Sequence, residues 1–256
     1  MRLKGIVIIL IFLLLSINFL SLLQTNSNLR ADTPPTFYVG SGEEYTTIFS
    51  AINAAWNMTN QTGLRCRVIV LNGTYYESLT IPIKLDLFGE DKGNTIIDGN
   101  DATDVIRINA SYVNISHFTI IDSGSGAFNS LIKINSDSAI ITDNVLHSGF
   151  LGIFINNSDG HIIYDNTIRD NSGDGIYLNN SDSNTNISYN SILRNRNGIY
   201  FYLSQLNYIY NNSIKSNSDN GIFLNKSCHQ TTVKRNNVTD NSGNGIFLNI
   251  QETEYF

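Results

Sequence analysis

The second half of the sequence repeats one short motif at an almost constant interval, and this repeat constrains the fold more than any other feature. The motif is Gly-Ile followed by an aromatic residue and an apolar residue, and its glycines are Gly152, Gly175, Gly198, Gly221 and Gly245. The intervals between these glycines are 23, 23, 23 and 24 residues. A second marker recurs beside it, at Asn144, Asn166, Asn190, Asn212 and Asn236. Such regular spacing is typical of a solenoid, in which each repeat adds one turn.

Each repeat contains three short apolar clusters separated by Asn, Gly, Ser and Asp. The clusters are β-branched and alternate with a period of two, which predicts short strands and leaves no room for a helix. Three strands and three turns per repeat predict an all-β fold, a parallel β-helix with coils about 4.8 Å apart. The isoleucines should form columns inside it. Asn tolerates left-handed backbone and suits the turns, and a further series, Asn171, Asn195, Asn217 and Asn241, predicts a buried amide ladder.

The leucine-rich repeat is the alternative solenoid with a period near 23 residues. It requires an apolar residue five positions before its asparagine. The residues at this position are Ala139, His161, Thr185, Asn207 and Thr231. Four of the five are polar, which excludes this alternative.

The N-terminus has the pattern of an export signal. Arg2 and Lys4 precede an apolar run of 11 residues from Gly5 to Leu15, with a weaker continuation to Leu23. This pattern is typical of a secretory signal peptide, and the stretch to Leu23 is also just long enough to span a bilayer if it is not cleaved. We interpret residues 1–23 as a signal peptide or N-terminal anchor and residues 24–36 as a polar tether. The protein is then extracellular or at the cell surface, and contacts a membrane only through an uncleaved N-terminal segment.

The first third should cap the solenoid, because an uncovered first coil exposes a row of unpaired backbone groups. Residues Thr46 to Trp56 predict a helix, so residues 37–66 form the cap. Residues 67–256 then form the β-helix, of about eight coils. Strands are predicted at residues 67–71, 79–81, 85–87 and 95–97. The chain stops within a coil, which predicts end-to-end association or a sequence truncated at its C-terminus.

Several motifs of the first third resemble the opening of NosD-like and pectin-lyase-fold proteins. They are Phe37-Tyr38-Val39-Gly40, Tyr45-Thr46-Thr47-Ile48, Asn72-Gly73-Thr74-Tyr75, Gly89-Glu90-Asp91-Lys92 and Thr95-Ile96-Ile97-Asp98-Gly99. The later repeats are similar to the parallel β-helix repeats of the carbohydrate-binding and sugar-hydrolase group. The resemblance covers residues 37–250 and implies the fold, a right-handed single-stranded parallel β-helix. It does not select an activity, because that group contains esterases, lyases, hydrolases, epimerases and binding modules.

Composition excludes several kinds of partner. The chain has 16 Lys+Arg and 22 Asp+Glu, a net charge of −6, without basic runs, so we expect no nucleic-acid binding. Its two cysteines exclude a disulfide scaffold. About seven coils separate Cys66 from Cys228, so both should be free, Cys66 beneath the cap. The 11 Asn-x-Ser/Thr sequons would be glycosylation sites only in a host that modifies them.

Residues with catalytic or metal-binding chemistry are sparse. The chain lacks the adjacent aspartates of polygalacturonase-like hydrolases. Asp143 and Asp165 occupy equivalent positions one coil apart and are candidates for an acid/base pair or for Ca²⁺ ligands, the alternative being solvated turn residues. The NosD resemblance implies copper, but the four histidines fall at unrelated phases of the repeat. We therefore expect no metal site and no cofactor, the one alternative being Ca²⁺ at the two aspartates.

The aromatic position of the repeat is the strongest functional feature. Alternation along a strand should direct one column of rings outward. Its members are Phe154, Tyr177, Tyr200, Phe223 and Phe247. We expect five exposed rings, which either stack to stabilise the coils or bind a polysaccharide through the apolar faces of its sugars. The main hypothesis is a surface protein that binds extracellular carbohydrate or serves as a structural module. The alternatives are a polysaccharide lyase, hydrolase or epimerase with carboxylates on one face, and a copper-linked NosD-type role.

Overall fold

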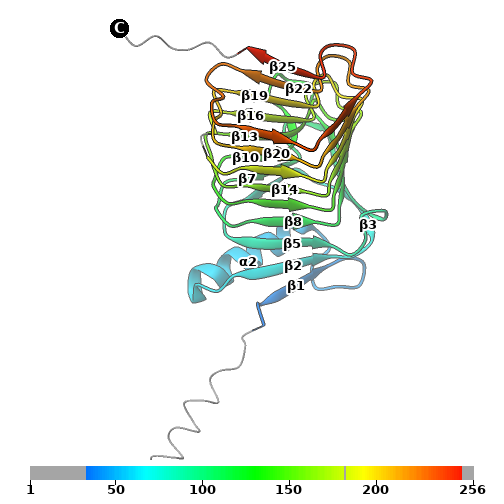
Figure 1. The fold of residues 1–256 in the computed structure, drawn as a ribbon. Helices are drawn as coiled ribbons and strands as arrows, with labels where there is room; N and C mark the ends of the chain where they lie inside the picture. The colour runs from blue at the N-terminus through cyan, green and yellow to red at the C-terminus, as the bar shows by residue number, and fades with distance from the viewer. Residues whose placement is uncertain (1–32, 182, 250–256) are drawn as a thin grey trace, which may run out of the picture. The chain divides into compact units, whose positions relative to one another are not determined.

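Three parallel β-sheets run along the protein in the computed structural model, which describes residues 33–181 and 183–249 (Figure 1). Each coil contributes one strand to each sheet, and equivalent residues of successive repeats pair with one another. Ile176, for example, pairs with Ile199, and Ile199 pairs with Ile222. The predicted parallel β-helix of about eight coils is therefore confirmed.

The strands of each sheet follow one another in chain order. Sheet A contains β1 (Thr36–Val39), β2 (Cys66–Val70), β5 (Leu85–Gly89), β8 (Asn114–Ser116), β11 (Ile140–Thr142), β14 (Ile162–Tyr164), β17 (Asn186–Ser188), β20 (Tyr208–Tyr210) and β23 (Thr232–Lys234). Sheet B contains β3 (Gly73–Tyr76), β6 (Thr95–Ala102), β9 (Thr119–Ser123), β12 (Val145–His147), β15 (Thr167–Arg169), β18 (Ser191–Leu193), β21 (Ser213–Lys215) and β24 (Asn237–Thr239). Sheet C contains β4 (Leu79–Ile81), β7 (Ile106–Ile108), β10 (Ser130–Ile134), β13 (Leu151–Asn156), β16 (Ile176–Asn179), β19 (Ile199–Tyr202), β22 (Ile222–Asn225) and β25 (Ile246–Asn249).

The interior consists of columns of like aliphatic side chains, as the repeat predicts. In sheet A the middle residue of successive strands is Ile141, Ile163, Ile187 and Ile209, each completely buried. Removing the side chain of such a residue beyond Cβ costs about 2–5 kcal/mol, because the lost burial adds to the cost of the cavity. The columns therefore supply much of the stability of the coils.

The corners between sheets combine a left-handed residue with a buried asparagine. At one A–B corner Asp165 has φ 55°, and the next residue, Asn166, is buried. The backbone N–H of Asn166 donates to Oδ1 of Asn190 at 2.9 Å, and its Nδ2 donates to the carbonyl of Ile141 at 2.8 Å. Each amide thus bonds both the preceding and the following coil, which satisfies buried backbone groups at the corner.

The B–C corners repeat this arrangement, which confirms the predicted buried ladder. There the N–H of Asn195 donates to Oδ1 of Asn217 at 2.9 Å. The left-handed residue of each A–B corner is the one before the repeated asparagine. These left-handed residues are Asp143, Asp165, Tyr189, Asn211 and Arg235. The asparagine is turned inward because only there can its amide reach both neighbouring coils.

The repeated glycine has a steric cause. A Cβ at Gly198 would lie 2.6 Å from the carbonyl oxygen of Gly221 in the next coil, and one at Gly175 would lie 2.7 Å from the carbonyl oxygen of Gly198. Real Cβ atoms essentially never approach an oxygen this closely. Successive coils therefore touch at this position, and only glycine fits there.

The first coil is covered by helix α2 (Ile48–Thr62), which lies against β1 and β2 at the end of the solenoid opposite β25 (Figure 1). Thr47 caps its N-terminus by accepting a hydrogen bond from the N–H of Ser50, and the carboxylate of Glu77 accepts from the N–H groups of the first two helical residues. The helix extends six residues beyond the predicted end at Trp56. The apolar pattern does not indicate these residues, because they are polar and mostly exposed. The helix ends at Gly63, which has a left-handed conformation. The buried thiol of Cys66 lies beneath it, 3.6 Å from the carbonyl oxygen of Ala55.

The strand predicted at residues 79–81 has the limits of β4, and the other three early strands are shifted or longer. β2 begins and ends one residue earlier than expected, β5 runs two residues further and β6 five residues further. Both cysteines are free, as expected, and both are buried. The predicted signal peptide or anchor lies outside the described residues. Within residues 33–181 and 183–249, no helix is long and apolar enough to span a bilayer.

Candidate functional site

The outward face of sheet C carries the predicted column of rings. Strand register places Phe154, Tyr177, Tyr200, Phe223 and Phe247 side by side on β13, β16, β19, β22 and β25. Successive ring centroids lie 5.1, 4.8, 5.0 and 4.8 Å apart, with planes inclined by 35–38°. We call these five residues the ring column. Their spacing matches the distance between strands, so neighbouring rings contact one another and also form a continuous apolar stripe.

The expectation that all five rings are exposed is wrong at Phe154, which is only 4% exposed. Tyr177, Tyr200 and Phe223 are half-buried, and Phe247 on the last strand is the exposed member of the column. Phe128, on the segment between β9 and β10, stacks on it with a centroid distance of 5.5 Å. The ammonium group of Lys133 lies 5.3 Å from the centre of the same ring. Phe128 is itself 55% exposed and contributes the outer ring at this end of the stripe. It belongs to no repeat, so sequence reasoning had no signal by which to find it.

A second column, of four amides and one tyrosine, runs beside the ring column. Strand register aligns Asn156, Asn179, Tyr202, Asn225 and Asn249, all two residues after the rings and therefore on the same face. Nδ2 of Asn179 donates to Oδ1 of Asn156 at 2.8 Å. Nδ2 of Asn225 donates to the hydroxyl of Tyr200 at 2.8 Å, which links the two columns. The face thus offers apolar rings and polar amides side by side.

An arginine–aspartate pair borders the ring column. Arg196 binds the completely buried Asp174 through two nitrogens, at 3.0 and 2.7 Å. Beside this pair is a cavity of about 130 Å³ whose lining includes Phe128, Phe150, Tyr177 and Arg196. Burial raises the pKa of Tyr177 to about 12, so its hydroxyl stays protonated at neutral pH. The cavity therefore combines three rings with a charged hydrogen-bond donor.

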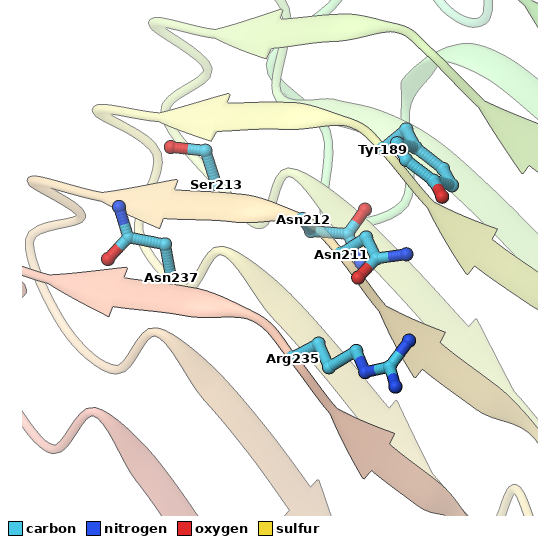
Figure 2. Close-up of a pocket in the computed structure, with 6 residues that line it drawn as sticks. All are labelled: Tyr189, Asn211, Asn212, Ser213, Arg235 and Asn237. Carbon is cyan, nitrogen blue, oxygen red and sulfur yellow. The ribbon is translucent and has the colours of Figure 1, made fainter.

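A different arrangement is found at the A–B corner of later coils. Tyr189, Asn211 and Arg235 follow β17, β20 and β23, and Figure 2 shows their side chains extending to the same side. Together with Asn212, Ser213 and Asn237 they line an open depression of about 500 Å³. Ser213 and Asn237 are the first residues of β21 and β24. We call this surface the corner depression.

The two candidate catalytic carboxylates occupy the same A–B corner, nearer the capped end. Asp143 forms an ion pair with Nζ of Lys92, and its other carboxylate oxygen lies 3.3 Å from Nε2 of His117. The His117 ring also shares a hydrogen bond of 2.7 Å with the hydroxyl of the buried Ser116. Asp165 follows the neighbouring strand, one coil further on, without an ion pair to any described residue. The structure therefore places Asp143 with a lysine and a histidine, a cluster that sequence spacing did not reveal.

Potential metal ligands do not converge in the described part of the chain. No three His, Cys, Asp or Glu residues within residues 33–181 and 183–249 lie close enough together to hold a metal ion. The absence of a cofactor in the active protein stays a prediction.

The solenoid places the chain in a family. A family model described as right-handed β-helix region matches residues 103–254, more than half of the sequence, so the chain belongs to the family of right-handed β-helix proteins. No curated protein matches the sequence.

Solved structures with the same fold include proteins that act on carbohydrates. The Dettilon tailspike protein is 13% identical, with a TM-score of 0.67 over 86% of this chain and 47% of that one. The Agl-KA catalytic domain is 14% identical, with a TM-score of 0.60 over 87% of this chain and 46% of that one. The catalytic domain of a GH87 α-1,3-glucanase, solved in complex with tetrasaccharides, is 12% identical, with a TM-score of 0.57 over 80% and 46%. The chain spans about half the length of these structures, and identities this low show the fold alone.

Proposed function

We propose that the protein is exported and binds extracellular carbohydrate along the outward face of sheet C. The observation that carries this proposal is the pairing of two columns on one face, rings with a spacing of 4.8–5.1 Å and amides beside them. Rings receive the apolar C–H faces of sugars, while amides donate to and accept from hydroxyl groups. The fold shared with carbohydrate-active enzymes supports the same class of ligand.

The geometry favours an extended chain over a single sugar. The ring column crosses five coils without interruption, and the cavity beside Phe128 and Tyr177 lies at one end of its accessible part. An extended polysaccharide can contact several rings at once, so that weak contacts add up. A single sugar would use only a small fraction of the stripe.

The test is retention of the full-length protein by insoluble polysaccharides. We expect the wild type to be retained and a variant with Tyr177, Tyr200 and Phe223 replaced by Ser to be lost to the soluble fraction. A matched control replaces two exposed tyrosines of sheet A, Tyr164 and Tyr208, and should be retained like the wild type. Circular dichroism must show the same β-sheet content in all three proteins. Equal loss in the control, or no retention of the wild type by any polysaccharide, would refute the proposal.

The cluster around Asp143 favours a second candidate function, a polysaccharide-active enzyme. A carboxylate in contact with an ammonium group and an imidazole is suited to proton transfer. The alternative predicts that the wild type releases reducing ends or unsaturated products from a polysaccharide and that Asp143→Asn abolishes this activity. Asp165→Asn is the matched comparison, since this residue occupies the equivalent position one coil further on without an ion pair to any described residue. Activity unaffected by Asp143→Asn would exclude the cluster as its source.

A further inference from the structure

We propose that the corner depression, formed by Tyr189, Asn211, Asn212, Ser213, Arg235 and Asn237, is a second binding site, for a sugar residue that carries an anionic group. It lies at the junction of sheets A and B, whereas the ring column lies on sheet C, so the two sites do not share residues. The proposal is therefore independent of the function proposed above.

The backbone fixes the side chains that form this site. Tyr189, Asn211 and Arg235 have φ values of 59°, 55° and 56°, in register on successive coils. The buried asparagine that follows each of them is held by the amide ladder, with the N–H of Asn190 donating to Oδ1 of Asn212 at 2.9 Å. Three recognition side chains are thus presented from one rigid, repeated corner (Figure 2), which lowers the entropic cost of binding.

The charge of Arg235 is not neutralised by the described part of the protein. No carboxylate of residues 33–181 or 183–249 lies within ion-pair distance of its guanidinium group. Arg194, at the equivalent left-handed position of the B–C corner, binds Asp170 through two nitrogens, at 2.6 and 2.9 Å. Lys234 adds a second positive charge beside Arg235, with its ammonium group 5.8 Å from the centre of the Tyr210 ring. The A–B corner thus carries positive charge in the coil of Arg235, whereas Asp143 and Asp165 occupy the equivalent positions nearer the capped end.

The neutral groups of the depression are also available to a ligand. The side chains of Asn211, Ser213 and Asn237 make no hydrogen bond with any residue that the structure describes. Tyr189 leaves 51% of its surface exposed at the edge. One ring, two amides and a hydroxyl around a guanidinium group match a sugar with hydroxyl groups and a carboxylate or sulfate, because the planar guanidinium binds such anions through two parallel hydrogen bonds. A neutral sugar would leave the charge unpaired.

The test measures binding of soluble oligosaccharides of equal length to the full-length protein by calorimetry. The probes are an oligogalacturonate, a sulfated oligosaccharide and a neutral cello-oligosaccharide. We expect one acidic probe to bind at least about tenfold more tightly than the neutral one, and its affinity to fall as salt is raised. The carboxylate and sulfate probes identify which anion the site accepts. Equal affinity for acidic and neutral probes would refute the proposal.

Variants localise the binding. Arg235→Gln should weaken binding of the acidic probe by about tenfold or more, since a charge-assisted hydrogen bond is lost, and Tyr189→Ser should also weaken it. The matched control is Arg194→Gln, which removes an arginine already paired with Asp170 and should leave affinity unchanged. The Ser variant of Tyr177, Tyr200 and Phe223 should keep its affinity for the acidic probe. Loss of that affinity in this last variant, or an equal loss in Arg194→Gln, would place binding elsewhere and overturn the proposal.

Discussion

His161 is a completely buried imidazole at the corner between sheets C and A, and it should make folding sensitive to mild acid. Its Nδ1 accepts a hydrogen bond from the backbone N–H of Ala139 at 3.2 Å, and its Nε2 lies 3.1 Å from the hydroxyl of Ser158. A ring that accepts from a backbone N–H is neutral at that nitrogen. Protonation would place a second N–H against the first and break the link between two coils.

The magnitude follows from the pKa. Burial lowers the pKa of His161 from 6.5 to about 4, and the partial opposing effects of Ser158, Asp137 and Asp159 do not offset it. Because the unfolded chain takes up a proton near pH 6.5 and the folded one only near pH 4, stability is full above pH 6.5 and falls as the pH drops towards 4. A shift of this size corresponds to a loss of ~3 kcal/mol in the free energy of unfolding.

Urea unfolding at several pH values between 7 and 4, followed by circular dichroism, measures this loss. The variant His161→Asn should remove most of the pH dependence, because Asn207 occupies the equivalent position two coils later and its Oδ1 accepts from the N–H of Thr185 at 2.9 Å. Replacing the exposed His229 by Asn is the control. Asp170 does not confound the result, since Arg194 and Arg169 lower its pKa to about 2 and its contribution is lost only below pH 3.8. A variant His161→Asn with the same acid sensitivity as the wild type would refute the reasoning.

Four further predictions concern the repeat, metals and association. Ile199→Ala should lower the free energy of unfolding by about 2–5 kcal/mol. Tyr200→Ser should lower it less, because a stacked ring adds roughly 0.5–1.5 kcal/mol beyond its burial. Urea midpoints compare the two variants, and equal losses would contradict the assigned inward and outward positions. Gly198→Ala should lower the free energy of unfolding by about 1–3 kcal/mol, because the added Cβ overlaps the carbonyl of Gly221. Gly42→Ala is the comparison: an added Cβ there meets no atom, and only its positive φ is strained. An unchanged free energy of unfolding in Gly198→Ala would show that the coils do not touch there. Cu²⁺ or a chelator should leave the melting temperature unchanged, and a rise that grows with Cu²⁺ concentration would reveal an unrecognised site. Finally, Ile246, Phe247 and Leu248 are exposed on β25, so we propose end-to-end self-association. Sedimentation at high concentration should detect it, and a variant with Phe247 and Leu248 replaced by Ser should weaken it. A monomeric wild type would exclude it.

The architecture could be predicted from the sequence because every repeat carries the same signal. Gly198 and Ile199 each pack against the equivalent glycine or isoleucine of the next coil. The period of the sequence therefore indicates which residues are in contact. The length of α2 could not be predicted in this way, since its last turns are polar and its C-terminus depends on one glycine, Gly63. Reading Gly63 as a helix stop would have placed the end correctly.

The candidate sites were less predictable because they depend on departures from the repeat. The ring column is a repeated feature and its alignment was predicted, but its covering by Phe128 arises from a non-repeated segment. The corner depression depends on one position of the repeat being Tyr189, Asn211 and Arg235 in successive coils. The sequence does not show that these three side chains form one surface, and only the strand register of the structure places them together. Likewise, Lys92 reaches Asp143 across 51 residues of sequence.

The amide ladder has a consequence for how this protein can change over generations. From Asn144 to Asn236, each ladder asparagine donates its backbone N–H to the side-chain oxygen of the equivalent asparagine in the next coil, so these coils are interchangeable. Loss of residues 198–220, one repeat of 23 residues, would join Asn197 to Gly221 and set Asn190 against Asn236 in the ladder. The shortened chain would keep a continuous interior and carry one ring fewer. Recombination between repeats can therefore lengthen or shorten the ring column by one coil at a time while the fold is kept.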